Sequence, residues 1–214
     1  MRKTILVLLA LSLVLIFALG FSADAATSAR GGVTPSNIPW NRQPSKKVTV
    51  EFKAPETSGD VSAAALTKIA LIIGISDYSG TSNDLNYCDD DAREVYDTLA
   101  GKYGFPTNNI TLLLDSKATD ANIRAGVDWL IANSGPGSSV VFYYSGHGSR
   151  SSSNMDSDAE KQDECIIPWE LSRIWDGELA AKFAQLTSTN NWICFDSCYS
   201  GGMNDIGNGG EVVT

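Results

Sequence analysis

From residue 68 onward the chain alternates short apolar runs with amphipathic segments, and this alternation restricts the fold more than any other sequence feature. The apolar runs have the length and composition of strands buried on both faces, as in parallel sheets. They occupy residues 69–75, 109–114, 139–144, 165–168 and 192–195. The intervening segments carry apolar residues at helical spacing and occupy residues 89–100, 119–131 and 176–186. Residues 145–164, rich in Ser and Asp, are predicted to form a polar loop. The sequence therefore predicts an α/β fold with helices on both faces of a mostly parallel sheet.

The first 25 residues have the pattern of a secretory signal peptide. Arg2 and Lys3 precede an apolar run, and residues 23–25 (Ala-Asp-Ala) provide a small-residue cleavage site. We expect cleavage before Ala26, no stable membrane span afterwards, and a secreted, cell-surface or periplasmic protein. An uncleaved anchor is the alternative, since residues 5–21 reach the lower limit for a spanning helix.

Residues 26–66 are punctuated by glycine and proline and carry no long apolar run. We interpret them as a linker. A pro-segment is the alternative, with basic residues in or just after this stretch as candidate cleavage points. Residues 67–214 form the predicted folded domain.

Charge and residue counts limit the function classes. The net charge of −9 argues against a nucleic-acid-binding surface and fits a cationic partner or a bound metal ion. Four cysteines are too few for a fold built on disulfides. His147 is the sole histidine, so any chemistry that needs an imidazole must use it.

Two apolar runs lead into segments that carry chemically reactive side chains. Residues 139–144 are followed by Ser-Gly-His147-Gly148, and residues 192–195 by Asp-Ser-Cys198. In parallel sheets, functional groups gather at the carboxyl ends of strands. A cysteine nucleophile needs a proton-transfer partner, usually histidine, and flanking glycines let backbone N–H groups approach a substrate carbonyl. The alternative is that His147 and Cys198 are both inert, as we expect of a cysteine inside a strand.

The segments YYSGHG and FDSCYSGG resemble those of the metacaspases and related caspase-like cysteine peptidases. The resemblance extends over about residues 69–205, and the histidine lies about 50 residues before the cysteine, as in caspases. It implies a caspase-like three-layer α/β/α sandwich. It also implies that Cys198 is the nucleophile and His147 its proton-transfer partner. The backbone N–H groups of Gly148 and Cys198 would form the oxyanion hole.

The resemblance further implies a primary specificity pocket. The pocket positions of the family are matched in this sequence by Cys88, Asp91, Ser145 and Asp196. Paired carboxylates recognise a guanidinium group well, so the pocket is expected to accept Arg or Lys of basic peptide or protein substrates. The three consecutive aspartates at 89–91 have a second interpretation, which is stabilisation of a helix N-terminus.

Calcium is a further implication, because many metacaspases are calcium-activated. Asp163, Asp176 and Asp205 match acidic positions of such sites, and Ca²⁺ prefers clustered carboxylates. Gly177 departs from the acidic pair of the family, with Glu178 as a possible substitute. The alternative is a solvated acidic loop, to which Asp156 and neighbouring acids contribute.

The sequence ends at Thr214, whereas the family continues with further strands after the catalytic cysteine. We therefore expect either a fragment or a minimal form that needs a p10-like C-terminal portion or self-association. An incomplete sheet exposes a strand edge, which favours such association.

These observations favour a secreted cysteine endopeptidase that cleaves after Arg or Lys by a Cys–His dyad and is stimulated by Ca²⁺. The main alternative is a catalytically weak or inactive caspase-like surface module that binds basic peptides or calcium. A calcium-binding structural or adhesion protein is a third hypothesis, based only on the acidic loops.

Overall fold

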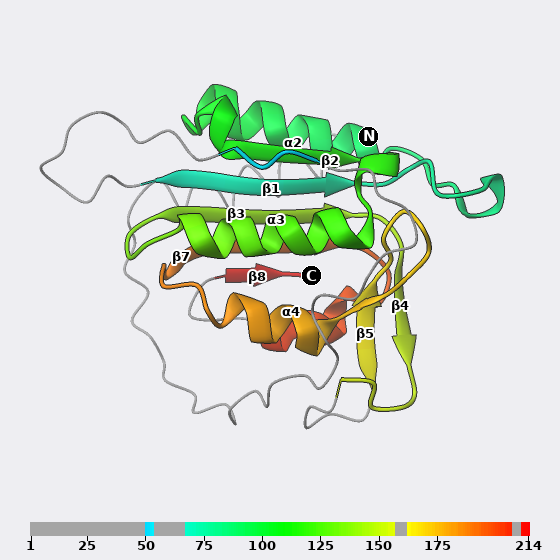
Figure 1. Cartoon of the computed structure of the whole chain (residues 1–214). Coiled ribbons are helices and arrows are strands. Elements are labelled where there is room, and N and C mark those ends of the chain that lie inside the picture. Colours follow the sequence, from blue (N-terminus) through cyan, green and yellow to red (C-terminus); the bar gives the residue numbers. More distant parts are fainter. Residues whose placement is uncertain (1–49, 54–66, 157–161, 207–210) are drawn as a thin grey trace, which may run out of the picture.

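The computed structural model describes residues 50–53, 67–156, 162–206 and 211–214. Its centre is a five-stranded parallel sheet with the order β2-β1-β3-β7-β8 (Figure 1). The strands are β1 (Lys68–Gly74), β2 (Ile110–Leu114), β3 (Ser139–Ser145), β7 (Asn190–Asp196) and β8 (Glu211–Val213). The predicted α/β class with a mostly parallel sheet is therefore confirmed.

Helices cover both faces of this sheet, as predicted (Figure 1). Helix α2 (Cys88–Lys102) packs on one face, and α3 (Asp120–Asn133) and α4 (Asp176–Phe183) pack on the other. Short 3₁₀ turns, η1 (Thr81–Asn83), η2 (Thr107–Asn109), η3 (Asp115–Lys117) and η4 (Ser200–Ile206), complete the connections. Within the described ranges, no helix has the length and apolar character needed to span a bilayer.

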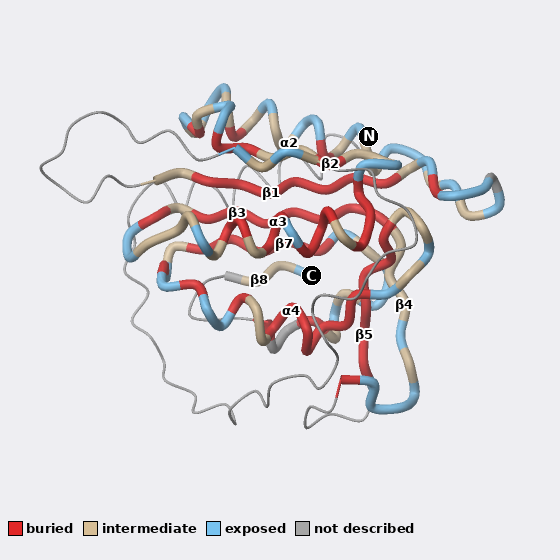
Figure 2. The backbone as a smooth tube through the Cα atoms, in the orientation of Figure 1, coloured by how far each residue is buried: buried red, intermediate tan, exposed pale blue. Residues whose placement is uncertain are grey.

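The central strands are buried on both faces, which explains their uninterrupted apolar sequences (Figure 2). Leu71 of β1 and Phe142 of β3 face α3 and α4, whereas Ile72 and Val141 face α2. Successive residues of a strand point to opposite faces, so both must be apolar when both faces are covered. The two resulting cores hold the central strands, and hence their carboxyl ends, in a fixed register.

The region after β3 differs from the prediction of one polar loop over residues 145–164. It contains β4 (Gly148–Ser151) and β5 (Asp163–Ile166), which form an antiparallel sheet with β6 (Ile174–Trp175). The prediction was wrong because β4 and the start of β5 lack an apolar pattern. Asp163 and Glu164 are buried by contacts from distant segments, which sequence periodicity does not reveal.

One described segment of the predicted linker contacts the domain. Phe52 stacks obliquely on Trp129 of α3 at a centroid distance of 6.2 Å, and Trp129 Nε1 donates to the Lys53 carbonyl at 2.7 Å. The signal-peptide prediction, and the linker prediction for residues 26–49 and 54–66, fall outside the described residues.

Candidate active site

The candidate site lies where β1, β3 and β7 end. The strand register aligns Gly74, Ser145 and Asp196 as the last residues of the three strands. Helix α2 begins directly against β1, because a β-carbon on Gly74 would stand 2.4 Å from the Cys88 carbonyl oxygen. The absent side chain at Gly74 thus lets Cys88 reach the end of the sheet.

His147 follows β3 and is half-buried. Its Nε2 atom lies 2.8 Å from the carbonyl oxygen of Asn83. A carbonyl only accepts hydrogen bonds, so Nε2 carries the proton in this contact and Nδ1 is the acceptor of the neutral ring. The ring is therefore oriented with one nitrogen available to take a proton.

Cys198 is an exposed free thiol in the turn after β7. The next residue, Tyr199, has a φ of 61°, which is uncommon for a bulky side chain. Left-handed backbone of this kind is costly and concentrates at functional sites. The turn presents the thiol to solvent at the carboxyl end of the central sheet.

Backbone contacts bring the histidine and cysteine segments together. Gly146 N donates to the Asp196 carbonyl at 3.3 Å, and Gly148 lies against the Cys198 backbone. His147 stands between these two glycines and is therefore held beside the cysteine turn. Among the described residues, neither ring nitrogen hydrogen-bonds Cys198. Hydrogen bonds between catalytic groups are often long in structures without a substrate.

The residues matched to the specificity pocket also lie together. The Cys88 thiol hydrogen-bonds the Ser145 side chain and interacts electrostatically with the negative charges of Asp196 and Asp91. Burial, followed by those charges, raises the pKa of Cys88. The phenol of Tyr143, which the sequence analysis missed, is buried beside Asp196. This group of residues is thus acidic and has a thiol that keeps its proton.

Burial also raises the pKa of the Asp196 carboxyl above the ordinary aspartate value. The residue is exposed overall, but its carboxyl lies close enough to Cys88 and Tyr143 to act electrostatically on both. A partly desolvated carboxylate interacts more strongly with a cation than one in bulk water. This favours a guanidinium or ammonium ligand.

The remaining cysteines, Cys165 and Cys194, are buried free thiols. Burial raises the pKa of each thiol to about 12. Cys165 belongs to the core under α3 and α4, and Cys194 to the core under α2, so the sheet separates them. A disulfide between them, which spacing left open, would require the sheet to rearrange.

A second cluster of carboxylates lies where β5 and α4 begin. Asp156, Asp163 and Asp176 are fully buried. Asp163 Oδ2 accepts from the N–H groups of Met155 and Asp156, the latter at 3.0 Å. Asp156 Oδ2 in turn accepts from Gly177 N at 2.8 Å, beside Asp176. Three of the chain's acids therefore meet at the start of α4.

One carboxylate of this cluster is incompletely hydrogen-bonded. Asp163 Oδ1 is buried and has no hydrogen-bond partner. Burying a carboxylate oxygen without a partner costs free energy of folding. Such an oxygen is a suitable ligand for a hard cation. In the part of the chain that the structure describes, however, no three His, Cys, Asp or Glu side chains are already arranged as a metal cage.

Of the predicted metal residues, the structure places Asp163 and Asp176 in this cluster. Asp205 lies in η4, but its side chain falls outside the described residues. Glu164 connects the cluster to η4, because a β-carbon on Gly202 would stand 2.1 Å from Glu164 Oε2. The cluster therefore lies next to the segment that follows Cys198.

Sequence reasoning missed three contributors to the site. The Asn83 carbonyl has no sequence signature, since every residue carries one. Asp156 appeared only as added negative charge, although its burial marks it as part of the cluster. Tyr78, whose ring lies 4.9 Å from that of His147, is distant in sequence and follows no motif.

Comparison with known proteins shows the family to which the chain belongs. The model of the metacaspase, peptidase C14 domain matches residues 68–207. Metacaspase-4 of Arabidopsis thaliana is 35% identical over 147 residues, which are 65% of this chain and 35% of that protein. Metacaspase-9 of Arabidopsis thaliana is 34% identical over 64% of this chain and 45% of its own length. Metacaspase-2 of Trypanosoma brucei brucei is 35% identical over 64% of this chain and 42% of its own length.

Among solved structures, a protein from Geobacter sulfurreducens has a TM-score of 0.52 and 24% identity, covering 62% of this chain and 50% of its own. At that identity the likeness shows the fold alone. The match to each curated relative thus spans less than half of the relative's length. Because the family model covers most of the chain, the protein belongs to the metacaspase family of C14 peptidases.

Proposed function

We propose that the chain is a cysteine endopeptidase that cleaves after Arg or Lys, with Cys198 as nucleophile and His147 as proton-transfer partner. One observation carries the proposal. The sole histidine is fixed by its Nε2 contact to Asn83 and stands between two glycines that contact the Cys198 segment. Family membership and the exposed free thiol support the same activity.

In the proposed reaction, Cys198 Sγ attacks the scissile carbonyl carbon while the thiol proton passes to His147 Nδ1. The backbone N–H groups of Gly148 and Cys198 stabilise the developing oxyanion. When the C–N bond breaks, the imidazolium returns the proton to the leaving amine. Water then attacks the thioester, loses a proton to the same ring, and releases the acid product and the thiol.

The substrate side chain enters the acidic pocket, where Asp91 and Asp196 accept hydrogen bonds from its guanidinium or ammonium group. The neutral Cys88 thiol and the Ser145 hydroxyl line the same pocket. Arg is the better ligand of the two, because its planar fork can contact two carboxylates at once.

The test is cleavage of paired peptides that differ only in Arg, Lys or Asp before the scissile bond, using the chain without residues 1–25. We expect cleavage after Arg and Lys, none after Asp, and none by the Cys198→Ala or His147→Ala variants. Cys165→Ala is the matched control, because it removes a thiol that is buried in the core. A folded, reduced protein that cleaves none of the peptides would favour the inactive binding module instead.

We further propose that Ca²⁺ stimulates this activity by binding at the buried acidic cluster. Asp156, Asp163 and Asp176 would hold the ion, and Asp205 is a further candidate ligand. The ion would supply the positive charge that Asp163 Oδ1 needs. Through Glu164, which contacts η4, an ordered cluster would stabilise the segment after Cys198.

Calcium binding is measured apart from activity, by thermal unfolding with CaCl₂, with MgCl₂ and with a chelator. We expect Ca²⁺ to raise the midpoint and Mg²⁺ to raise it less, because Mg²⁺ dehydrates reluctantly. Equal midpoints in CaCl₂ and chelator would leave the solvated acidic loop as the better description.

We also propose that the protein is exported and that its central sheet associates through one edge. The signal-peptide pattern of residues 1–25 supports export, which a fusion of residues 1–66 to a reporter enzyme would test. The short strand β8 forms one edge of the central sheet. We propose that a p10-like portion or a second copy adds to this edge, and sedimentation at several concentrations measures self-association.

A further inference from the structure

Two buried phenols hold the main chain of His147. Tyr78 Oη accepts the His147 N–H at 2.7 Å, and Tyr144 Oη donates to the His147 carbonyl at 2.7 Å. Both side chains are almost completely buried, with exposures of 1% and 0%. Each polar backbone group of the histidine is therefore held by a tyrosine hydroxyl.

Tyr78 alone also contacts the imidazole. Its ring centroid lies 4.9 Å from that of His147 at an interplanar angle of 43°. Asn83, which accepts from Nε2, belongs to the same connection between β1 and α2. The connection thus restricts His147 at its main chain, at one ring face and at one ring edge.

The phenol network extends to the end of β5. Tyr78 Oη donates to the Ile167 carbonyl at 3.3 Å, and Ile167 N donates to the His147 carbonyl at 3.0 Å. Burial raises the pKa of Tyr78, so the phenol keeps the proton that it donates. Gly146 makes room for the network, because its β-carbon would stand 2.7 Å from both hydroxyl oxygens.

We propose that Tyr78 is a positioning residue for His147, acting through its hydroxyl on the histidine N–H and through its ring on the imidazole face. The inference rests on the proposed peptidase function and assigns Tyr78 no contact with substrate. Tyr78 keeps Nδ1 directed at the thiol proton and at the leaving amine. Displacement of a catalytic group by about 1 Å is enough to cost about 100-fold in rate.

The test compares three hydroxyl deletions. Tyr78→Phe removes the acceptor of the His147 N–H and keeps the ring. Tyr144→Phe removes a hydroxyl from the same network without touching the imidazole. Tyr96→Phe is the matched control, because Tyr96 is a half-buried tyrosine of α2 that packs on the opposite core.

We expect Tyr78→Phe to lower kcat about 10- to 100-fold, with KM within about twofold, because positioning affects the reaction rather than binding. Tyr144→Phe should lower the unfolding midpoint as much as Tyr78→Phe does, but it should lower kcat less. Tyr96→Phe should change neither the midpoint nor kcat. If Tyr78→Phe has the kcat of the wild type, or falls in kcat only as much as Tyr144→Phe at equal loss of stability, the proposal is wrong.

A second readout needs no peptide cleavage. Iodoacetamide alkylates Cys198 at pH 6.5, and mass spectrometry of the peptide that contains Cys198 measures the rate. Measuring that peptide distinguishes alkylation of Cys198 from alkylation of Cys88. An isolated thiol is mostly protonated at this pH, so assistance by the histidine shows as a faster rate than in His147→Ala. We expect Tyr78→Phe to fall toward the His147→Ala rate and Tyr96→Phe to keep the wild-type rate.

The two readouts separate the inference from the function on which it rests. If the wild type cleaves no peptide but Tyr78→Phe slows alkylation, the peptidase proposal fails and the positioning role stands. If the wild type cleaves peptides but Tyr78→Phe alkylates at the wild-type rate, the positioning role is overturned. Equal alkylation of the wild type and His147→Ala would overturn both assignments to the histidine.

Discussion

Gly148 lies directly against the backbone of Cys198: a β-carbon built on Gly148 would stand 1.9 Å from the Cys198 carbonyl oxygen. No side chain fits into that space unless the cysteine turn moves. The same two residues supply the proposed oxyanion-hole N–H groups, so their mutual distance determines the geometry of the hole.

We therefore predict that Gly148→Ala lowers kcat by about 100-fold or more, which is the loss seen when one oxyanion donor is removed. The fold should survive, since the displaced segment is an exposed turn. Gly101→Ala is the control, because an added β-carbon meets nothing within 4 Å in α2. It should leave activity unchanged and raise stability by about 0.5–1 kcal/mol. Wild-type activity in Gly148→Ala would contradict the assignment.

Asp196→Asn should weaken the pocket and stabilise the fold at the same time. We expect at least about a tenfold fall in kcat/KM for Arg peptides, since one of two carboxylates that bind the cation is lost. Glu94→Gln, an exposed acid of α2, is the control for the change in charge. Kinetics on Arg and Lys peptides measure the effect, and an unchanged Arg preference would place the pocket elsewhere.

The pH dependence of stability tests the same carboxyl. Burial raises the pKa of Asp196, so the folded state holds this proton more tightly than the unfolded chain. Ionisation of Asp196 therefore costs stability above the raised pKa, and this cost disappears below the ordinary value of about 3.9. We expect Asp196→Asn to unfold at a higher temperature than the wild type at pH 7, with a difference that vanishes as the pH falls through this window.

Asp163→Asn should abolish the calcium response. The substitution keeps the side chain's size but removes the charge of a buried carboxylate. We expect the Ca²⁺-induced rise of the unfolding midpoint to disappear, and any stimulation of cleavage with it. Asp97→Asn, which changes an exposed aspartate of α2, should respond to Ca²⁺ like the wild type. A full calcium response in Asp163→Asn would move the site away from this cluster.

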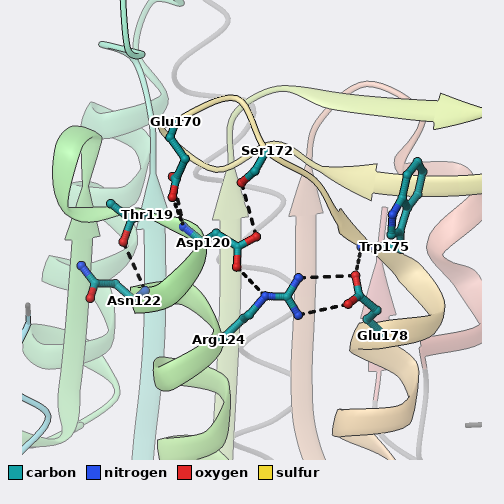
Figure 3. Close-up of polar contacts among 8 residues, drawn as sticks. All are labelled: Thr119, Asp120, Asn122, Arg124, Glu170, Ser172, Trp175 and Glu178. Atoms are coloured by element: carbon teal, nitrogen blue, oxygen red, sulfur yellow. Dashed lines mark hydrogen bonds and ion pairs between the residues drawn. The ribbon is translucent and has the colours of Figure 1, made fainter. Parts of the chain in front are cut away.

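The buried arginine of α3 should contribute strongly to stability (Figure 3). Arg124 is 3% exposed, bonds Asp120 through Nε at 2.5 Å, and contacts Glu178 with both terminal nitrogens at 3.2 and 3.4 Å. We predict that Arg124→Leu costs about 3–5 kcal/mol in urea unfolding, because two buried carboxylates lose their cation.

The matched control is Arg93→Ala on α2. Arg93 pairs with Asp89 at 3.7 Å, but its side chain is 53% exposed. Water screens such a pair, so its loss should cost less than about 0.5 kcal/mol. Equal effects of the two variants would mean that the buried network contributes no more than a surface pair.

The order of strands and helices in the central layer could be predicted from the sequence, because burial on both faces imposes a local pattern. Residues 69–75 are apolar throughout, and β1 was found within one residue of that run. Strands β4 and β8 escaped prediction, since their pairing depends on partners distant in sequence and their own residues show no periodicity.

The proposed catalytic pair could likewise be chosen from the sequence, because only one histidine exists and both motifs follow apolar runs. The Tyr78 contact with His147 could not be named, because it joins residues about 70 positions apart that share no pattern. The acidic cluster lies between these cases: composition showed the charge, but only the fold determined which carboxylates are buried.

The sequence by itself determined which residue types could react and which strands would end beside them, because side-chain chemistry and hydrophobic periodicity are local properties. Tertiary structure alone decided how His147 is oriented, how closely Gly148 approaches Cys198, and which oxygen of Asp163 is left without a partner. These depend on distances between segments that packing brings together, and no local pattern encodes such distances.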